Sequence, residues 1–356
     1  MRYYSISLTS PSGQLYQPPS VPVKFSPPAS YTSFTNGKTI PNAWNIELDI
    51  PITTYALIAG TAWVKIWGIS LQEISQAKNL NGYQAVISGG MKPGLPLATA
   101  ASSQSGILTK GTVFQSFGNW IGTDQSLDLM FLPSTGKTWV NGGITDPTIN
   151  LTLNWKPGTP LGPALQSALT VAFPNDPSEG LVAPQIVGID KINQNIIDKA
   201  DNTHFCKTLT ELAQFVRSRS QVIIGGNYPG VDITFDGTTI NVFDSTNITK
   251  TTMLNFQDMI GQPTWIAPNT IQTKLVMRSD ITIGSMIKFP QGIPVTTQGS
   301  AYPAQFDQKS AFQGSFYVIS PIRHLGNFRQ PDAASWVTVI NATALNISGT
   351  PAATGY

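Results

Sequence analysis

The feature that most constrains the fold is a series of short apolar runs separated by glycine and proline. Residues 43–50 alternate strictly, with apolar side chains at every second position and Asn45, Glu47 and Asp49 between them. This period of two is typical of a strand with one buried face. The chain contains 31 glycines and 27 prolines, which favour many turns over long helices. The sequence therefore predicts a mainly β protein with minor α content.

Charged residues are scarce in this chain. They make up 11% of the residues, where about 25% is usual. Two interpretations stay open: a surface of uncharged polar residues, or a surface that partners largely cover. The net charge of +2 gives no reason to expect stable nucleic-acid binding. No apolar run reaches the length of a membrane helix, so we expect no stable membrane association.

The order of the runs predicts five regions. Residues 1–40 are predicted to form an extended N-terminal arm, which either packs on a neighbouring subunit or lies as a surface loop. Residues 41–158 are predicted to form a first β-barrel domain. Residues 159–250 carry most of the helix signal, and residues 251–348 form a second β-barrel domain before a short tail at 349–356. Tyr3 to Leu8 alternate as a strand does, although the arm is expected to have no core of its own.

Helix starts are marked by capping residues and by a proline. Ser70 with Glu73 three residues later predicts a capping box, and Thr208 with Glu211 predicts another. Pro163 is expected at the first position of a helix that Pro174 ends.

The second predicted helix covers residues 209–219. Arg217 and Arg219 are expected at its C-terminus, where they complement the helix dipole. Residues 221–224 are then expected to form a strand, and Asp236-Gly237 to turn a hairpin between residues 231–235 and 239–243.

Two stretches near the C-terminus carry a family resemblance. The turn Ile260-Gly261-Gln262-Pro263 leads into a β-rich run over residues 271–277, and apolar residues resume up to residue 289. Residues 316–342 then contain His324-x-Gly326 at the end of one strand and Trp336 at the start of the next. This pattern resembles the baseplate hub proteins of contractile and related phage tails and of tail-like particles.

The resemblance implies a fold and an assembly. Its fold is two tube-like β-barrel domains with a small α/β insert, and its assembly is a homotrimeric, pseudo-sixfold ring. The implied partners are the central spike protein, the tail tube or a tube-initiator protein, the tape-measure protein and other baseplate proteins, with DNA only in transit through the lumen. The implied location is the tail baseplate of a virion, assembled in the host cytoplasm.

The resemblance implies no enzyme, no catalytic residue, no cofactor and no metal. Asn327 and Phe328 after Gly326, and Pro331 in the closing loop, depart from the family pattern. They leave the subfamily open.

The candidate catalytic and phosphate-binding motifs of the sequence are weak, which agrees with a structural role. Residues 134–138 end like a phosphate-binding loop, but Phe131 stands where its first glycine is needed. His204 and Cys206 would share one face of a strand, so a Cys-His dyad is conceivable, although a structural thiol is favoured. The carboxylate pairs Asp124 with Asp128 and Asp190 with Asp198 have no spacing that selects them.

Five of the eight tryptophans divide into two groups. Trp44, Trp67 and Trp336 are expected in the core, and Trp120 and Trp265, near turns, as interface anchors. The last two support an alternative function, a β-rich carbohydrate-binding or cell-wall-hydrolysing tail-associated protein that stacks sugars on them.

Overall fold

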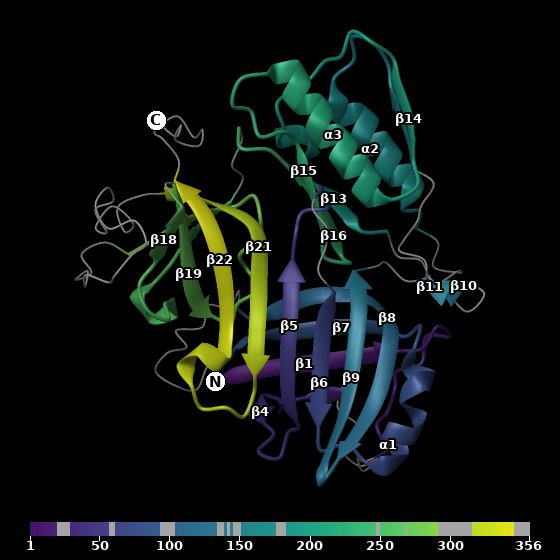
Figure 1. Ribbon diagram of the computed structural model, residues 1–356, viewed down its shortest axis with the longest axis vertical. Coiled ribbons are helices and arrows are strands. Elements are labelled where there is room, and N and C mark those ends of the chain that lie inside the picture. Colours follow the sequence, from purple (N-terminus) through teal and green to yellow (C-terminus); the bar gives the residue numbers. More distant parts are fainter. Residues whose placement is uncertain are drawn as a thin grey trace.

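A computed structural model gives the structure of the chain. It describes residues 1–19, 29–56, 61–92, 104–133, 139–140, 143–144, 151–175, 183–246, 250–267, 269–290 and 315–344. The predicted mainly β fold with minor α content is confirmed: strands dominate, and a small α/β insert sits at one end of the molecule (Figure 1). The predicted tail at 349–356 lies outside the described residues.

Within the described residues, thirteen strands form one continuous sheet in the order β18-β19-β22-β21-β5-β6-β9-β8-β7-β1-β2, with β17 and β20 attached beside β21. The first module comprises β1 (Arg2–Thr9), β2 (Tyr31–Thr32), β5 (Asn45–Ile52), β6 (Ala62–Trp67), β7 (Gln84–Met91), β8 (Gly106–Ile121) and β9 (Asp124–Pro133). The second module comprises β17 (Thr251–Met253), β18 (Thr264–Ala267), β19 (Thr270–Val276), β20 (Met286–Lys288), β21 (Ser315–Asn327) and β22 (Trp336–Ala344).

The remaining elements are shorter or lie in the insert. The insert comprises β12 (Leu151–Trp155), α2 (Leu161–Ala172), β13 (Gln185–Val187), η5 (Ile189–Lys191), β14 (Asn202–Cys206), α3 (Leu209–Ile224), β15 (Asp232–Phe235) and β16 (Thr239–Phe243). The others are β3 (Phe34–Thr35), β4 (Lys38–Thr39), α1 (Leu71–Gln76), η2 (Ala77–Leu80), β10 (Trp139–Val140), β11 (Gly143–Ile144), η6 (Phe256–Asp258) and η8 (Ala333–Ser335).

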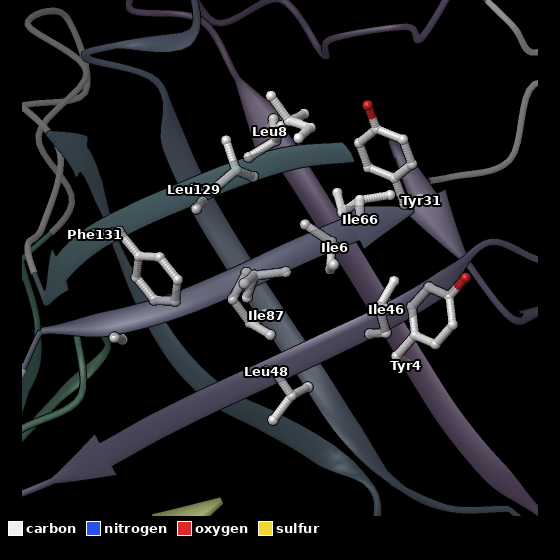
Figure 2. Close-up of a cluster of buried hydrophobic side chains, with 14 of the residues drawn as sticks. Tyr4, Ile6, Leu8, Tyr31, Ile46, Leu48, Ile66, Ile87, Leu129 and Phe131 are labelled. Atoms are coloured by element: carbon white, nitrogen blue, oxygen red, sulfur yellow. The ribbon is translucent and has the colours of Figure 1, made fainter. Parts of the chain in front are cut away.

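The first core closes because the sheet curls until β1 faces β5. Tyr4, Ile6 and Leu8 of β1 are fully buried. Figure 2 shows them across the core from Ile46 and Leu48 of β5, with β1 crossing the other strands. The expectation that residues 1–40 form an arm without a core is therefore wrong for β1. Its eight residues pair along the whole of β7, and its alternating side chains complete the core.

The insert has a separate core between its two helices and its strands. Leu165 and Leu169 of α2 and Leu212 and Val216 of α3 pack there with Trp155 of β12. β12 was predicted in the first domain, but it pairs with β14 and buries alternate residues in the insert core. The predicted hairpin at Asp236-Gly237 is confirmed by the antiparallel pairing of β15 with β16.

The second module shares β21 with the first. The beginning of β21 pairs with β20, whereas residues Ile322 to Asn327 pair with β5, and β22 runs beside both parts. A register shift between Ile319 and Ile322 bends the strand between the two parts. Each module is thus an open, curled part of one sheet around its own core, rather than one of two separate barrels.

The helices begin where their capping residues predict, with one exception, and α3 ends later than predicted. Ser70 and Glu73 form the reciprocal capping box of α1, and Thr208 caps α3. α2 starts at Leu161, so Pro163 is its third residue and not its first.

α3 continues to Ile224, so the strand predicted at residues 221–224 is wrong. Nothing interrupts the helix before Gly225, which has a φ of +70° and ends it. Arg217 and Arg219 therefore lie inside the helix and pair with Asp232 and Asp198 across the insert. No helix among the described residues combines the length and apolarity needed to cross a bilayer.

Gly326 on β21 provides a test of this packing. A Cβ there would lie 2.7 Å from Cζ3 of Trp336 and 2.9 Å from Cγ of Leu48. We expect Gly326→Ala to lower the free energy of unfolding by about 1–3 kcal/mol through overpacking, measured by urea denaturation. Gly162→Ala is the matched control, because its Cβ meets Ile189 at an ordinary 3.4 Å inside α2, where alanine is favoured. Wild-type stability in Gly326→Ala would contradict the close approach.

Candidate functional site

The predicted Cys-His pair lies on β14 but lacks the properties of a nucleophilic dyad. Cys206 is fully buried, and burial raises the pKa of its thiol to about 11, with the nearby Glu211 adding to the effect. His204 stacks on Phe215, with ring centroids 4.4 Å apart and planes inclined by 7°. A protonated, enclosed thiol is a poor nucleophile, so both side chains serve packing.

The carboxylates proposed as pairs are held in separate structural roles. Asp128 is buried and accepts hydrogen bonds from Nε1 of Trp63 at 3.0 Å and Nδ2 of Asn119 at 2.7 Å. Asp198 pairs with Arg219, whose hydrogen bond lowers the pKa of that carboxyl to about 2. Asp124 and Asp190 are exposed at a turn and a 3-10 helix. These contacts are structural, and they give neither pair the roles of a catalytic acid and base.

Two of the tryptophan predictions are wrong. Trp265 is only 8% exposed and packs in the second core, 6.1 Å from Phe316 between ring centroids, so it is no surface anchor. Trp120 is 62% exposed near the tip of the β8–β9 hairpin, with Nε1 donating to the Gly122 carbonyl. Trp67, expected inside, lies outside, because Val64 and Ile66 take the inward positions of β6.

An aromatic and charged surface covers the outside of the first module. We call it the outer face: the side of β21, β5, β6 and β9 that points away from the first core and carries Glu47, Asp49, Trp63, Lys65, Trp67, Asp128, Arg323 and Asn327. In Figure 1 these strands lie side by side in front of β1, while α2 and α3 lie at the far end of the molecule. The alternation of Val64, Lys65 and Ile66 was the signal that could have placed Trp67 on it.

Hydrogen bonds and ion pairs fix the side chains of the outer face. Nζ of Lys65 lies between two indole rings, 5.8 Å from the centroid of Trp63 and 4.7 Å from that of Trp67. Nε1 of Trp67 donates to Glu47, which faces Lys65 in the register. Each ring is therefore held by a carboxylate at its edge and a shared cation at its face.

Both cations of the outer face have carboxylate partners. Nζ of Lys65 is 3.7 Å from Oδ1 of Asp128, and Arg323 donates two hydrogen bonds to Asp49. The five charged side chains carry three negative and two positive charges, so the outer face is nearly neutral. Such a surface would not hold phosphate groups strongly.

A cavity of about 280 Å³ lies where the three cores meet. Ile52 and Leu108 of the first module, Val187 and Thr234 of the insert and His324 of the second module are among its lining residues. We call it the junction cavity. Pockets between domains are common ligand sites, and this one contains the buried His324.

His324 is held by the neighbouring strand β22. Nδ1 of its ring lies 2.9 Å from Oγ1 of Thr338 on β22. Burial lowers the pKa of His324 to about 4, so the ring is neutral near pH 7.

Among the described residues, no group of three or more His, Cys, Asp or Glu side chains is arranged to hold a metal ion. The loop at residues 134–138 that ends like a phosphate-binding loop lies outside the described residues.

Comparisons with known proteins give only distant structural likenesses. No family model matches the chain, and no curated protein matches it. A tail protein from Neisseria meningitidis MC58 aligns over 98% of this chain and 99% of its own, with 10% identity and a TM-score of 0.45. The 43 kDa tail protein of prophage MuSo2 from Shewanella oneidensis aligns over 96% and 98%, with 9% identity and a TM-score of 0.46. A chain of a PdpA-VgrG complex aligns over 100% of this chain and 66% of its own, with 10% identity and a TM-score of 0.42. At these identities and scores, none of them assigns a function to this chain.

The buried thiol gives a direct chemical test. With a pKa of about 11, Cys206 has a thiolate fraction near pH 8 of only about one in a thousand, and the fold covers it. We expect a thiol reagent to label the folded protein at least about a hundredfold more slowly than the urea-unfolded protein. Val171→Cys in a Cys206→Ser background reports reagent access on exposed α2. Equal labelling rates for Cys206 before and after unfolding would contradict the buried, protonated thiol and would support a reactive Cys206–His204 dyad.

His324 predicts a pH dependence of stability. Its folded pKa of about 4 lies below the unfolded value of 6.5, so acidification from pH 6.5 to 4 protonates the unfolded chain first and destabilises the fold. The full effect is about 3 kcal/mol.

We expect His324→Phe to lose less stability than the wild type between pH 7 and about pH 4.5 in urea denaturation. Burial raises the pKa of Asp232 to about 6, which acts in the opposite direction, since the folded state then binds that proton first. This contribution is common to both proteins and cancels in the comparison. Parallel pH profiles would show that His324 titrates normally.

Proposed function

We propose that this protein is the structural baseplate hub of a phage or phage-like tail. In this role three copies form a ring that joins the hexameric tail tube to the trimeric central spike. The observation that carries the proposal is the pair of β modules in one chain, each with its own core and joined through β21. Two modules per copy turn a threefold ring into a pseudo-sixfold one, which matches a different symmetry on each side.

The closing hairpin supports the same role. The residues that carry the hub resemblance lie together in it: His324 pairs with Thr338, and Gly326 faces Trp336 across β21 and β22. Trp336 is 2% exposed and donates its indole N–H to the Gly90 carbonyl at 3.0 Å. Trp336 of this motif thus connects the second module to β7 of the first, which is a structural role.

We place the outer face toward the channel of the ring. Its cations are paired with carboxylates, so it would let the tape-measure protein and then DNA pass without retaining phosphates. Partners are then the homotrimer itself, the spike, the tube or its initiator and other baseplate proteins. The protein would reside in the virion baseplate after assembly in the host cytoplasm, without stable membrane association.

We infer no catalytic activity for this protein. The thiol is buried, the two histidines pack or hydrogen-bond, and two of the four proposed carboxylates, Asp128 and Asp198, are in ion pairs.

Electron microscopy of the purified protein tests the proposal. We expect class averages of a ring with threefold symmetry and an axial opening, and a trimer mass in sedimentation. A monomer, or a rod without an opening, would contradict the hub role.

A cysteine label tests the orientation of the outer face. Gln115→Cys places a thiol on β8 on the same side of the sheet as the outer face, because Gln115 pairs with Met130 and Met130 pairs with Trp63, and Cys206→Ser removes the native thiol. A small gold label at this position should lie on the inner wall of the ring. Val171→Cys on the exposed side of α2 is the control and should place the label elsewhere. Labels from Gln115→Cys on the outer rim would reject the channel assignment while leaving the ring intact.

The exposed Trp120 supports the carbohydrate-binding alternative. Its indole is 62% exposed with its N–H already satisfied, so the free ring surface is apolar. A monomer whose Trp120 fluorescence changes on adding cell-wall oligosaccharide would favour this alternative over the hub.

A further inference from the structure

We propose that the junction cavity binds a small, neutral aryl alcohol. The apolar ring of the ligand would lie between the first module, the insert and the second module, and its hydroxyl would donate to Nε2 of His324. This site is separate from the assembly role proposed above and does not depend on it.

The volume of the cavity suits a single ring. Its 280 Å³ is close to the lower end, about 300 Å³, of pockets that hold organic ligands. A nucleotide or an oligosaccharide is larger than this space. Several aliphatic residues line it from different modules, which favours an apolar body for the ligand: Ile52, Leu108, Val187, Ile281 and Ile322.

The hydrogen bonds of Thr338 fix the tautomer of His324. The Thr338 hydroxyl donates to the Arg278 carbonyl at 3.2 Å and accepts from the Arg278 N–H at 3.0 Å. With its proton donated to that carbonyl, the hydroxyl accepts from Nδ1 of His324, 2.9 Å away, and this is the tautomer that we propose. The neutral ring therefore carries its proton on Nδ1 and presents Nε2 as an acceptor.

Of the two ring nitrogens of His324, Nε2 is the one that remains for a ligand. His324 is 1% exposed and lines the cavity, and within the described part of the chain only its Nδ1 has a side-chain or backbone partner. A buried acceptor gains about 1–3 kcal/mol from a partner, so a ligand with a hydroxyl is favoured over one without.

The charged residues at the wall favour a neutral ligand. Nζ of Lys250 donates to the Asp280 carbonyl. Oδ1 of Asp236 accepts hydrogen bonds from the Thr238 and Thr239 backbone N–H groups in the β15–β16 turn. Both charges are oriented by their own loops, and the buried Thr234 is one of the uncharged polar residues that line the cavity.

Phenol and toluene form a matched pair of probes, because they share a shape and differ in the hydroxyl. With the full-length protein near pH 7.5, we expect calorimetry or ligand-detected NMR to show phenol binding about tenfold more tightly than toluene, as one hydrogen bond predicts. Equal affinities, or no phenol binding, would overturn the proposal.

The same substitution at the two histidines provides the control. His324→Phe removes the acceptor and should abolish the preference for phenol, whereas His204→Phe replaces a ring stacked on Phe215 in the insert and should preserve it. Retained discrimination in a folded His324→Phe protein would exclude Nε2 as the acceptor.

Imidazole nitrogen NMR decides the question if His324→Phe does not fold. The chain has two histidines, so His204→Phe assigns the His324 signals directly. Phenol should shift the Nε2 signal of His324 and toluene should not. An Nε2 signal that is unchanged at saturating phenol would overturn the assignment.

Discussion

The antiparallel pairing of β21 with β5 is the contact on which the rest of the structure depends. Six residue pairs, from Ile322 with Ile52 to Asn327 with Glu47, join the last long strand of the chain to an early one. Without them the two modules would each expose a strand edge, which invites non-native pairing. With them, one continuous sheet covers both cores. The bend after Ile319 lets the other end of β21 pair with β20.

The insert is fastened to this sheet at several points rather than hanging from it. Tyr55, in the loop after β5, is buried in the insert core, and its backbone N–H donates to the Ile233 carbonyl at 2.8 Å. Gly237 approaches β8 so closely that a Cβ would lie 2.0 Å from the Lys110 carbonyl oxygen. Tyr317 of β21 donates to the Asp244 carbonyl. These contacts hold the insert against both modules.

Local patterns in the sequence predicted the elements well and their partners poorly. The alternation of residues 43–50, the capping box at Ser70 and the Asp236-Gly237 turn depend on near neighbours, and all three predictions are confirmed. Tertiary contacts decided the failures. Residues 1–40 were predicted to be an arm because β7, the strand with which β1 pairs, lies about eighty residues away in the sequence. Trp265 was predicted to be exposed because Phe316, which packs against it, is also distant in the sequence. The outer face and the junction cavity combine strands from distant regions, so no local pattern reveals them; only the inward Val64 and Ile66 hinted that Trp67 faces out.

The position of β21 in the sequence has a consequence for biosynthesis. β5 is complete after residue 52, but its partner spans residues 315–327. A nascent chain therefore leaves the ribosome with one side of β5 unpaired during most of its synthesis. The hydrogen bonds of Arg2 also form only after the hairpin of β21 and β22 has been synthesised. They go to the backbone carbonyls of four residues of that hairpin: Asn327, Phe328, Gln330 and Asp332. Contacts of such high sequence separation slow folding and prolong exposure to aggregation, so the native sheet can form only after residues 315–344 have been synthesised.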